Sequence, residues 1–80
     1  MRIDKYLKVA RVLKRRAVAK ELGDNNRLMI NGKIAKASSE VKVGDVVDIL
    51  FGHRHLKIEI LEVKAVYKKD DDLMYRILES

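Results

Sequence analysis

Cysteine is absent from this 80-residue sequence, and aromatic residues make up only 5% of it. Without cysteine the chain can form neither a disulfide framework nor a zinc site built on thiolates, which suits a reducing compartment. No apolar run approaches the roughly 20 residues of a membrane span. The N-terminus also lacks the apolar block of a secretion signal. We therefore expect a cytoplasmic protein that does not enter membranes.

Hydrophobic residues are plentiful, at 48% of the sequence. A chain of this length has enough apolar surface for one core and too little for two. Because aromatics are scarce, that core is expected to be aliphatic. We predict a single domain over residues 1–80, with its motif core at about residues 1–50 and further strands over residues 51–80.

Positive charge is concentrated at one end of the chain. The net charge is +6, and residues 1–40 hold eleven basic and four acidic side chains, against seven and eight in residues 41–80. The first twenty residues carry eight basic groups and one acid, Asp4. This asymmetry indicates a polyanionic partner near the N-terminus. The alternative is a solvated surface that only keeps the protein soluble.

Residues 3–13 are predicted to form an amphipathic helix. Its apolar stripe is Ile3, Tyr6, Leu7, Ala10 and Leu13. The opposite side is basic and carries Arg2, Lys5, Lys8 and Arg11. Val9 and Val12 fall on the basic side, against the pattern. By register Tyr6 is expected at the edge of the core, with stacking on an RNA base as the alternative role.

Residues 3–22 contain neither glycine nor proline, but one continuous helix would place Glu21 in the apolar stripe. A break near residues 12–14 resolves this and predicts a second helix over residues 15–22. On that helix Val18 and Leu22 share one face, and Arg16 and Lys20 share the opposite one. Residues 23–26, Gly-Asp-Asn-Asn, supply the turn that ends it.

From residue 27 the hydrophobic period changes to two. Asn31-Gly32 is a strong signal for a tight hairpin turn, and Gly44-Asp45 predicts a second turn. Leu61 breaks the alternation and predicts a bulge or bend, with Val63 and Val66 continuing beyond it. The predicted extended segments are residues 27–30, 33–35, 41–43, 46–51, 56–60 and 73–78, with a charged turn at 68–72. We therefore predict an α+β fold of two short helices packed on a small, bent, mostly antiparallel sheet.

The basic residues of the N-terminal half can meet successive phosphates of a nucleic acid, and arginine can also hold a phosphate bidentately. They are Arg2, Lys5, Lys8, Arg11, Lys14, Arg15, Arg16, Lys20, Arg27, Lys33 and Lys36. Charge alone does not separate RNA from DNA. No helix-turn-helix core, zinc finger or aromatic-rich RNA-binding strand is evident.

The sequence offers little for catalysis. His53 and His55 form a His-x-His pair that could ligate a metal, but no third ligand is evident and an exposed strand start is the favoured interpretation. Ser38 and Ser39 lack a histidine nearby in sequence and suit a loop. The acids at residues 70–72 suit a solvated turn. We therefore expect a protein without enzymatic activity, metal or cofactor.

Four short patterns occur in a fixed order: Arg-x-Asp-Lys at residues 2–5, Arg-x-x-Ala-Lys at 16–20, Asn-Gly at 31–32 and Val-x-x-Gly-Asp at 41–45. Together, in RIDKYLKVARVLKRRAVAKEL and RLMINGKIAKASSEVKVGDVVDI, they resemble the S4 RNA-binding domain, also called the alpha-L RNA-binding fold. In that family two short helices pack on a bent sheet, and the RNA surface comes from the helices and the hairpin after them.

The resemblance implies RNA-facing roles for Arg2, Lys5, Arg11, Arg16, Asn31 and Lys36. Combined with the basic pattern, the predicted RNA-binding residues are Arg2, Lys5, Lys8, Arg11, Arg15, Arg16, Lys20, Asn31, Lys33 and Lys36. Two departures stand out. Position 17 is alanine where many members have serine or threonine, which puts a helix-capping contact in doubt, and residues 23–26 replace a Gly-Gly type of turn.

Its short length makes the chain most similar to the stand-alone S4-domain factors of bacterial ribosome-associated quality control. This resemblance implies binding to large ribosomal subunits that carry peptidyl-tRNA, through ribosomal RNA and tRNA, and support of C-terminal alanine tailing beside a tailing factor. A monomer is expected. The alternatives are a heat-shock S4 factor that recycles stalled large subunits, the RNA-binding subunit of an RNA-modifying enzyme, or a protein-interaction or DNA-binding module.

Overall fold

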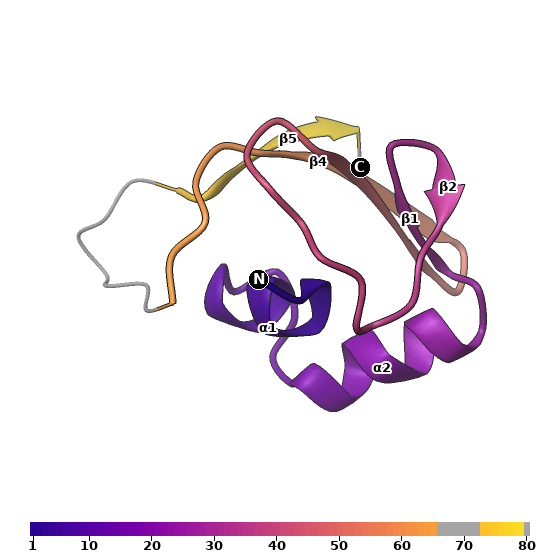
Figure 1. Cartoon of the computed structure of the whole chain (residues 1–80). Coiled ribbons are helices and arrows are strands. Elements are labelled where there is room, and N and C mark those ends of the chain that lie inside the picture. The colour runs from indigo at the N-terminus through magenta and orange to yellow at the C-terminus, as the bar shows by residue number, and fades with distance from the viewer. Residues whose placement is uncertain (66–72, 80) are drawn as a thin grey trace.

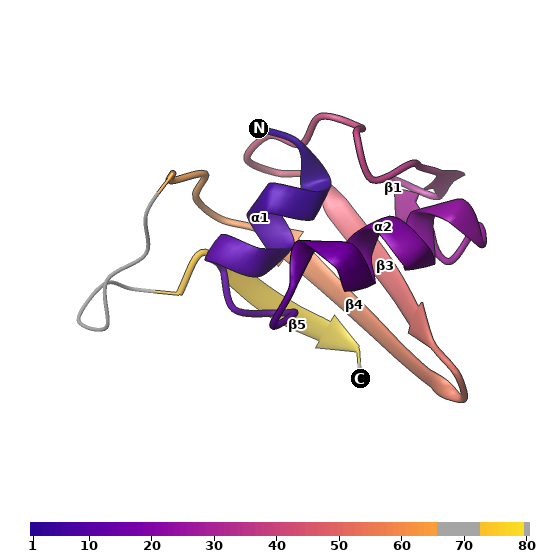
Figure 2. The same cartoon turned by 90° about the horizontal axis from the view of Figure 1, so that it is seen from below.

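Two helices cover one face of a five-stranded antiparallel sheet in the part of the chain that the computed structural model describes, residues 1–65 and 73–79 (Figure 1). The helices are α1 (Ile3–Val9) and α2 (Arg16–Asp24). The strands are β1 (Leu28–Ile30), β2 (Lys33–Ile34), β3 (Val46–Phe51), β4 (Arg54–Ile60) and β5 (Tyr75–Glu79), in the order β2-β1-β3-β4-β5. Seen from below, both helices lie in front of the sheet (Figure 2). The predicted α+β class is confirmed.

The two faces of the sheet differ in polarity. Val47 and Ile49 on β3, and Ile58 and Ile60 on β4, point toward the helices and are fully buried. The alternate positions point away from the helices and are largely polar; they include Asp48, His55, Glu59 and Arg76. This alternation is what a sheet with one covered face requires.

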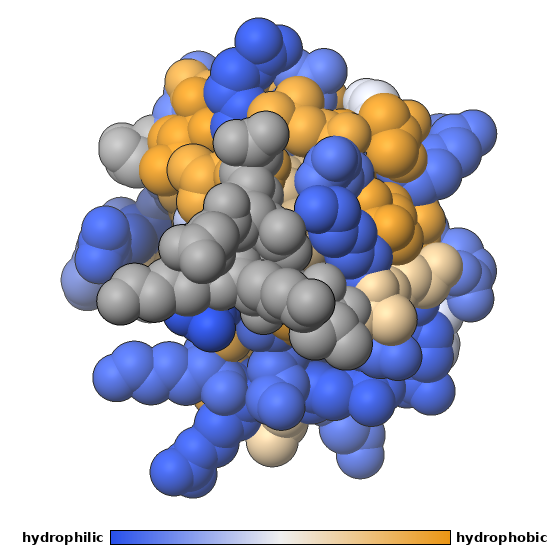
Figure 3. Space-filling view, turned by 90° about the vertical axis from the view of Figure 1, so that its left-hand side faces the viewer, coloured by the Kyte–Doolittle hydropathy of each residue, from blue (hydrophilic) through white to orange (hydrophobic). Residues whose placement is uncertain are grey.

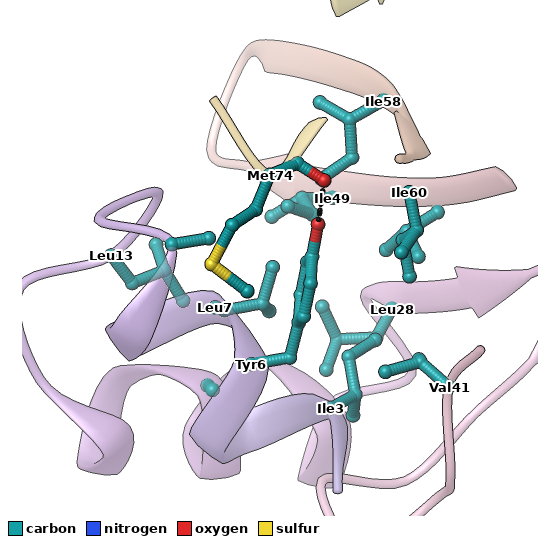
Figure 4. Close-up of a cluster of buried hydrophobic side chains, with 13 residues drawn as sticks. Ile3, Tyr6, Leu7, Leu13, Leu28, Val41, Ile49, Ile58, Ile60 and Met74 are labelled. Carbon is teal, nitrogen blue, oxygen red and sulfur yellow. Dashed lines mark hydrogen bonds between the residues drawn. The ribbon is translucent and has the colours of Figure 1, made fainter. Parts of the chain in front are cut away.

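The core lies between α1 and the sheet and is mostly aliphatic, as predicted (Figure 4). All five residues of the predicted apolar stripe are buried, with Ile3, Tyr6 and Leu7 completely so. Tyr6 stands in the middle of the cluster, and its hydroxyl donates a 2.7 Å hydrogen bond to the carbonyl oxygen of Met74 (Figure 4). This bond joins α1 to the chain just before β5.

Helix α1 ends four residues earlier than the sequence predicts. It stops at Val9 because Arg11 takes a left-handed conformation (φ 63°), a role usually filled by glycine. The amide of Arg11 donates to the Lys8 carbonyl (3.0 Å) and the amide of Val12 to the Leu7 carbonyl (2.9 Å), which is the Schellman pattern. Leu13 therefore reaches the core from a loop.

Helix α2 begins one residue later and ends two residues later than predicted. Its N-cap, Arg15, makes no side-chain capping bond, in line with the doubt raised by alanine at position 17. Asn26 is left-handed (φ 58°) and ends the helix. Gly23 lies so close to the following loop that a Cβ there would stand 2.7 Å from the amide nitrogen of Ala37. Glycine at this position lets α2 pack against residues 36–37.

The β1–β2 hairpin turns at Asn31-Gly32 as predicted, with φ values of 53° and 82°. The predicted extended segment at residues 41–43 is not a strand of the sheet. Val41 is buried, but its amide donates to the Met1 carbonyl, so this segment packs against the N-terminus and does not join the sheet. The register of β4 against β5 shifts between Lys57 and Ile58. At Leu61, where the sequence predicts a bulge or bend, the amides of Leu61 (2.8 Å) and Glu62 (3.1 Å) both donate to the Met74 carbonyl, which is the pattern of a β-bulge.

Strand β4 begins at Arg54, two residues before its predicted start. Strand β5 begins at Tyr75, two residues after the predicted start of the last strand. Val63 is partly buried against the core but belongs to no strand. The predictions for Val66 and for a charged turn at 68–72 fall outside the described residues.

Candidate RNA-binding surface

The helix layer forms the basic side of the molecule. Figure 3 shows hydrophilic side chains crowded over its lower part, where the helices lie, and apolar side chains above, toward the sheet. All ten predicted RNA-binding residues are exposed. We call seven of them the basic helical face: Arg2, Lys5, Lys8, Arg11, Arg15, Arg16 and Lys20.

Arg2 and Arg16 meet at one buried carboxylate, that of Asp4. The Arg2 Nη2 atom lies 3.1 Å from Asp4 Oδ2, and the Arg16 Nη2 atom lies 3.2 Å from Asp4 Oδ1. The Lys5 amide also donates to Oδ1, at 2.7 Å. Arg2 immediately precedes α1 and Arg16 starts α2, so Asp4 ties the beginnings of both helices together.

The environment of Arg16 differs from the prediction. The sequence places Val18 and Leu22 on one face of the second helix, opposite Arg16, but Val18 is 37% exposed and Leu22 is only partly buried. The buried side consists of Ala19 and Gly23. In a helix residue 16 lies nearly in line with residue 23. Arg16 therefore flanks the packed side of α2 and reaches Asp4 on α1.

Asn31 is exposed, but its side chain makes hydrogen bonds that stabilise the turn in which it lies. Its Nδ2 donates to Asp45 Oδ1 (3.1 Å), and its Oδ1 accepts from the Val46 amide (2.9 Å). Asp45 is 6% exposed and also accepts from the Lys42 amide at 2.9 Å. These bonds fix the hairpin that carries Lys33. Lys36, beside α2, contacts Asn26 Oδ1 at 3.4 Å.

Tyr6 has no part in this surface. Its side chain is fully buried rather than at the edge of the core, so it cannot stack on a base as the alternative role required. Burial, with a smaller contribution from Tyr75, raises the pKa of the Tyr6 hydroxyl far above its ordinary value. The hydroxyl is therefore a permanent hydrogen-bond donor to Met74.

The two histidines lie where the β3–β4 hairpin turns, with His53 in the turn and His55 near the start of β4. His55 Nε2 is 2.5 Å from Asp48 Oδ1 and its Nδ1 is 3.9 Å from Glu79, on the sheet face that the helices leave open. Within residues 1–65 and 73–79, no three histidine or acidic side chains come together as a metal site. Nor is any helix in those ranges long and apolar enough to cross a bilayer.

Replacing both His53 and His55 with alanine is expected to change little. The pair between His55 and Asp48 is half exposed, and pairs of that kind contribute about 0–1 kcal/mol. We expect a stability loss below about 1 kcal/mol and unchanged RNA affinity, measured by thermal unfolding and filter binding. A large loss of binding, or a loss on adding a chelator to the wild type, would reveal a site at this hairpin.

Sequence reasoning missed the two buried acids, Asp4 and Asp45. Among the described residues they are the charged side chains that the fold buries, and each holds part of the predicted surface. A signal was present for Asp4, because it is the single acid among eight basic groups in the first twenty residues. Its burial and its bond to Arg16 could be found only after α1 and α2 were packed together.

These features define a small α+β protein with a cationic helix layer. The S4 domain family matches residues 1–47. The RQC P-site tRNA stabilizing factor of Streptococcus pneumoniae is 51% identical over 79 residues, covering 98% of this chain and 90% of that protein. The protein of the same name from Bacillus subtilis is 48% identical over 81 residues, covering 100% and 94%.

A solved structure agrees with the sequence comparisons. The trimeric structure of Vibrio cholerae heat shock protein 15 matches with a TM-score of 0.83 and 28% identity, covering 96% of this chain and 80% of that one. The chain therefore belongs to the S4 domain family, and within it to the group whose members are named RQC P-site tRNA stabilizing factor.

Proposed function

We propose that this protein is a non-catalytic RNA-binding factor that associates with the large ribosomal subunit while that subunit still carries peptidyl-tRNA. The observation that carries the proposal is the basic helical face, whose seven exposed lysines and arginines lie on or beside both helices. Such a layer suits the closely spaced phosphates of folded RNA. The names of the relatives, which specify P-site tRNA, support ribosomal RNA and tRNA as the ligands.

In this proposal the protein acts as a cytoplasmic monomer in ribosome-associated quality control. It stabilises the tRNA of the stalled chain while a separate tailing factor adds alanines to the C-terminus. The RNA contacts would come from nine of the ten predicted residues. Lys5, Lys8, Arg16 and Lys20 lie within the helices, and Arg2, Arg11 and Arg15 flank them. For Asn31 the proposed part is indirect, because its amide is engaged with Asp45 and Val46.

Sedimentation tests the proposal. Purified protein is mixed with large subunits carrying peptidyl-tRNA, with vacant large subunits, and with small subunits, and each mixture is run through a sucrose gradient. We expect the protein to migrate with the large subunits and to be retained best when peptidyl-tRNA is present. Migration as free protein in all three gradients would refute the ribosomal role.

A heat-shock factor that recycles stalled subunits is the second candidate, favoured by the structural match to heat shock protein 15. Reconstituted alanine tailing separates the two functions. If the protein is the quality-control factor, omitting it should sharply reduce alanine addition to the nascent chain. If tailing proceeds equally well without it, the recycling function is the better assignment.

Binding is expected to weaken steeply as salt rises. Each phosphate that a lysine or arginine neutralises releases counterions, which contributes a slope of about 0.7–0.9 to the plot of log affinity against log salt concentration. The measurement is a titration of a structured RNA at increasing KCl concentration. A slope near zero would show that the basic helical face does not carry the binding.

A further inference from the structure

Asp4 occupies an unusual position for an acid on an RNA-binding surface. It is 5% exposed, among the core residues at the start of α1, and a negative charge so close to phosphates opposes binding. A buried carboxylate is also costly unless hydrogen bonds satisfy it. Here both oxygens have partners: Arg2 on Oδ2, and Arg16 with the Lys5 amide on Oδ1.

The two arginines use only part of their hydrogen-bonding capacity on this carboxylate. Each approaches Asp4 through its Nη2 atom, and the side chains of Arg2 and Arg16 stay 51% and 46% exposed. A guanidinium has five N–H donors in a fixed plane, so donors remain on both for an outside ligand. With two arginines and one aspartate, the cluster has a net charge of +1.

We propose that Asp4 is a positioning residue that holds Arg2 and Arg16 as a preorganised pair for one backbone phosphate of RNA. The inference rests on the proposed function and adds to it a defined subsite and a residue that acts through others. Arg2 and Arg16 are fourteen positions apart in the sequence, and Asp4 is the group that both contact. Restraining flexible side chains before binding reduces the entropy lost when the ligand arrives.

The direction in which one substitution changes the RNA affinity distinguishes a positioning role for Asp4 from a simple effect of its charge. Asp4→Asn removes a negative charge beside the RNA surface, so electrostatics alone predicts tighter binding. Positioning predicts the reverse, because Arg2 and Arg16 lose their shared anchor. We expect RNA affinity to fall about tenfold, as for loss of one charge-assisted contact. The salt slope should also fall by about one phosphate contact although the net charge rises.

Asp24→Asn is the matched control. Asp24 is exposed at the C-terminal end of α2, and its substitution makes the same change of charge and shape. We expect equal or slightly tighter binding for this variant. If Asp4→Asn binds as tightly as Asp24→Asn, Asp4 has no positioning role.

A second variant keeps the proposal testable if Asp4→Asn fails to fold in thermal unfolding. The double variant Arg2→Lys with Arg16→Lys keeps the charge and leaves cations able to pair with Asp4, but loses the planar guanidinium donors. It is expected to stay folded and to bind about tenfold more weakly. Wild-type affinity in the double variant would overturn the paired-arginine subsite.

Two probes keep this inference apart from the proposed function. One is the large subunit carrying peptidyl-tRNA, and the other is a synthetic RNA hairpin. If wild-type protein binds the hairpin but not the subunit, the ribosomal role fails, and the hairpin still reports the effect of Asp4→Asn. If wild-type protein binds both and Asp4→Asn leaves both affinities unchanged or higher, the positioning role fails by itself.

Discussion

Tyr6→Ala is expected to destabilise the protein by about 3–5 kcal/mol, in the range of large-to-small replacements of buried aromatic side chains. Tyr6 is fully buried at the centre of the core, and the variant would leave a cavity and remove the hydroxyl bond to the Met74 carbonyl, which would keep only its bonds from the Leu61 and Glu62 amides. A chain of this length has a total stability of about 4–12 kcal/mol. Urea unfolding should therefore show a much lower midpoint, with a substantial unfolded fraction before urea is added.

Tyr6→Phe is the control that isolates the hydroxyl. It keeps the ring and removes only the bond to the Met74 carbonyl, so we expect a loss of about 1–2 kcal/mol. Its RNA affinity should equal that of the wild type, because the ring faces the sheet and not the basic helical face. Loss of RNA binding in a folded Tyr6→Phe variant would show that Tyr6 contacts the RNA after all.

Arg16→Ala is expected to weaken large-subunit binding by about 1–3 kcal/mol, the range of charge-assisted contacts. From the sequence alone, this replacement would be expected to leave stability within about 0.5 kcal/mol of the wild type. The structure changes that expectation. Asp4 would keep Arg2 and the Lys5 amide but lose one cation, so a stability loss of about 1 kcal/mol is expected.

Arg76→Ala is a well-matched comparison for Arg16→Ala. Arg76 is also an exposed arginine paired with an acid, Glu59, but it lies on β5 and points away from the helices. We expect it to bind nearly as the wild type does. Arg16→Lys should recover only part of the lost affinity if the guanidinium holds a phosphate bidentately. Equal binding by Arg16→Ala and Arg76→Ala would show that α2 does not face the RNA.

Local patterns were sufficient to predict most of the fold. The apolar stripe from Ile3 to Leu13 is buried throughout, because spacing along a helix determines which side chains face the core. The Asn31-Gly32 turn formed as expected, since both residues tolerate a positive φ. Along β4, the alternation of apolar and polar residues agrees with the burial of Ile58 and Ile60 on the covered face of the sheet.

The errors occurred where tertiary contacts override local preference. Helix α1 ends through a left-handed arginine, Arg11, which carries no signal of the kind that glycine or asparagine gives. Val41 has the composition of a strand residue, but its segment pairs with the N-terminus. The buried side of α2 is the small pair Ala19 and Gly23, because close approach to residues 36–37 excludes larger side chains there.

The candidate surface was predictable in composition but not in organisation. Counting charges located the basic residues, and the structure leaves all of them exposed. Counting could not show that Arg2 and Arg16 share a buried carboxylate, or that the Asn31 side-chain amide is hydrogen-bonded to Asp45 and Val46. Those contacts depend on how elements distant in the sequence pack against one another.

The most direct test of the central claim is protection of lysines from acetylation, measured by mass spectrometry with and without large subunits carrying peptidyl-tRNA. If the helix layer binds the RNA, Lys5, Lys8 and Lys20 should become protected in the complex. Lys57, on the sheet face away from the helices, should react at the same rate in both samples. Protection of Lys57 with continued reactivity of the three helical lysines would contradict the account.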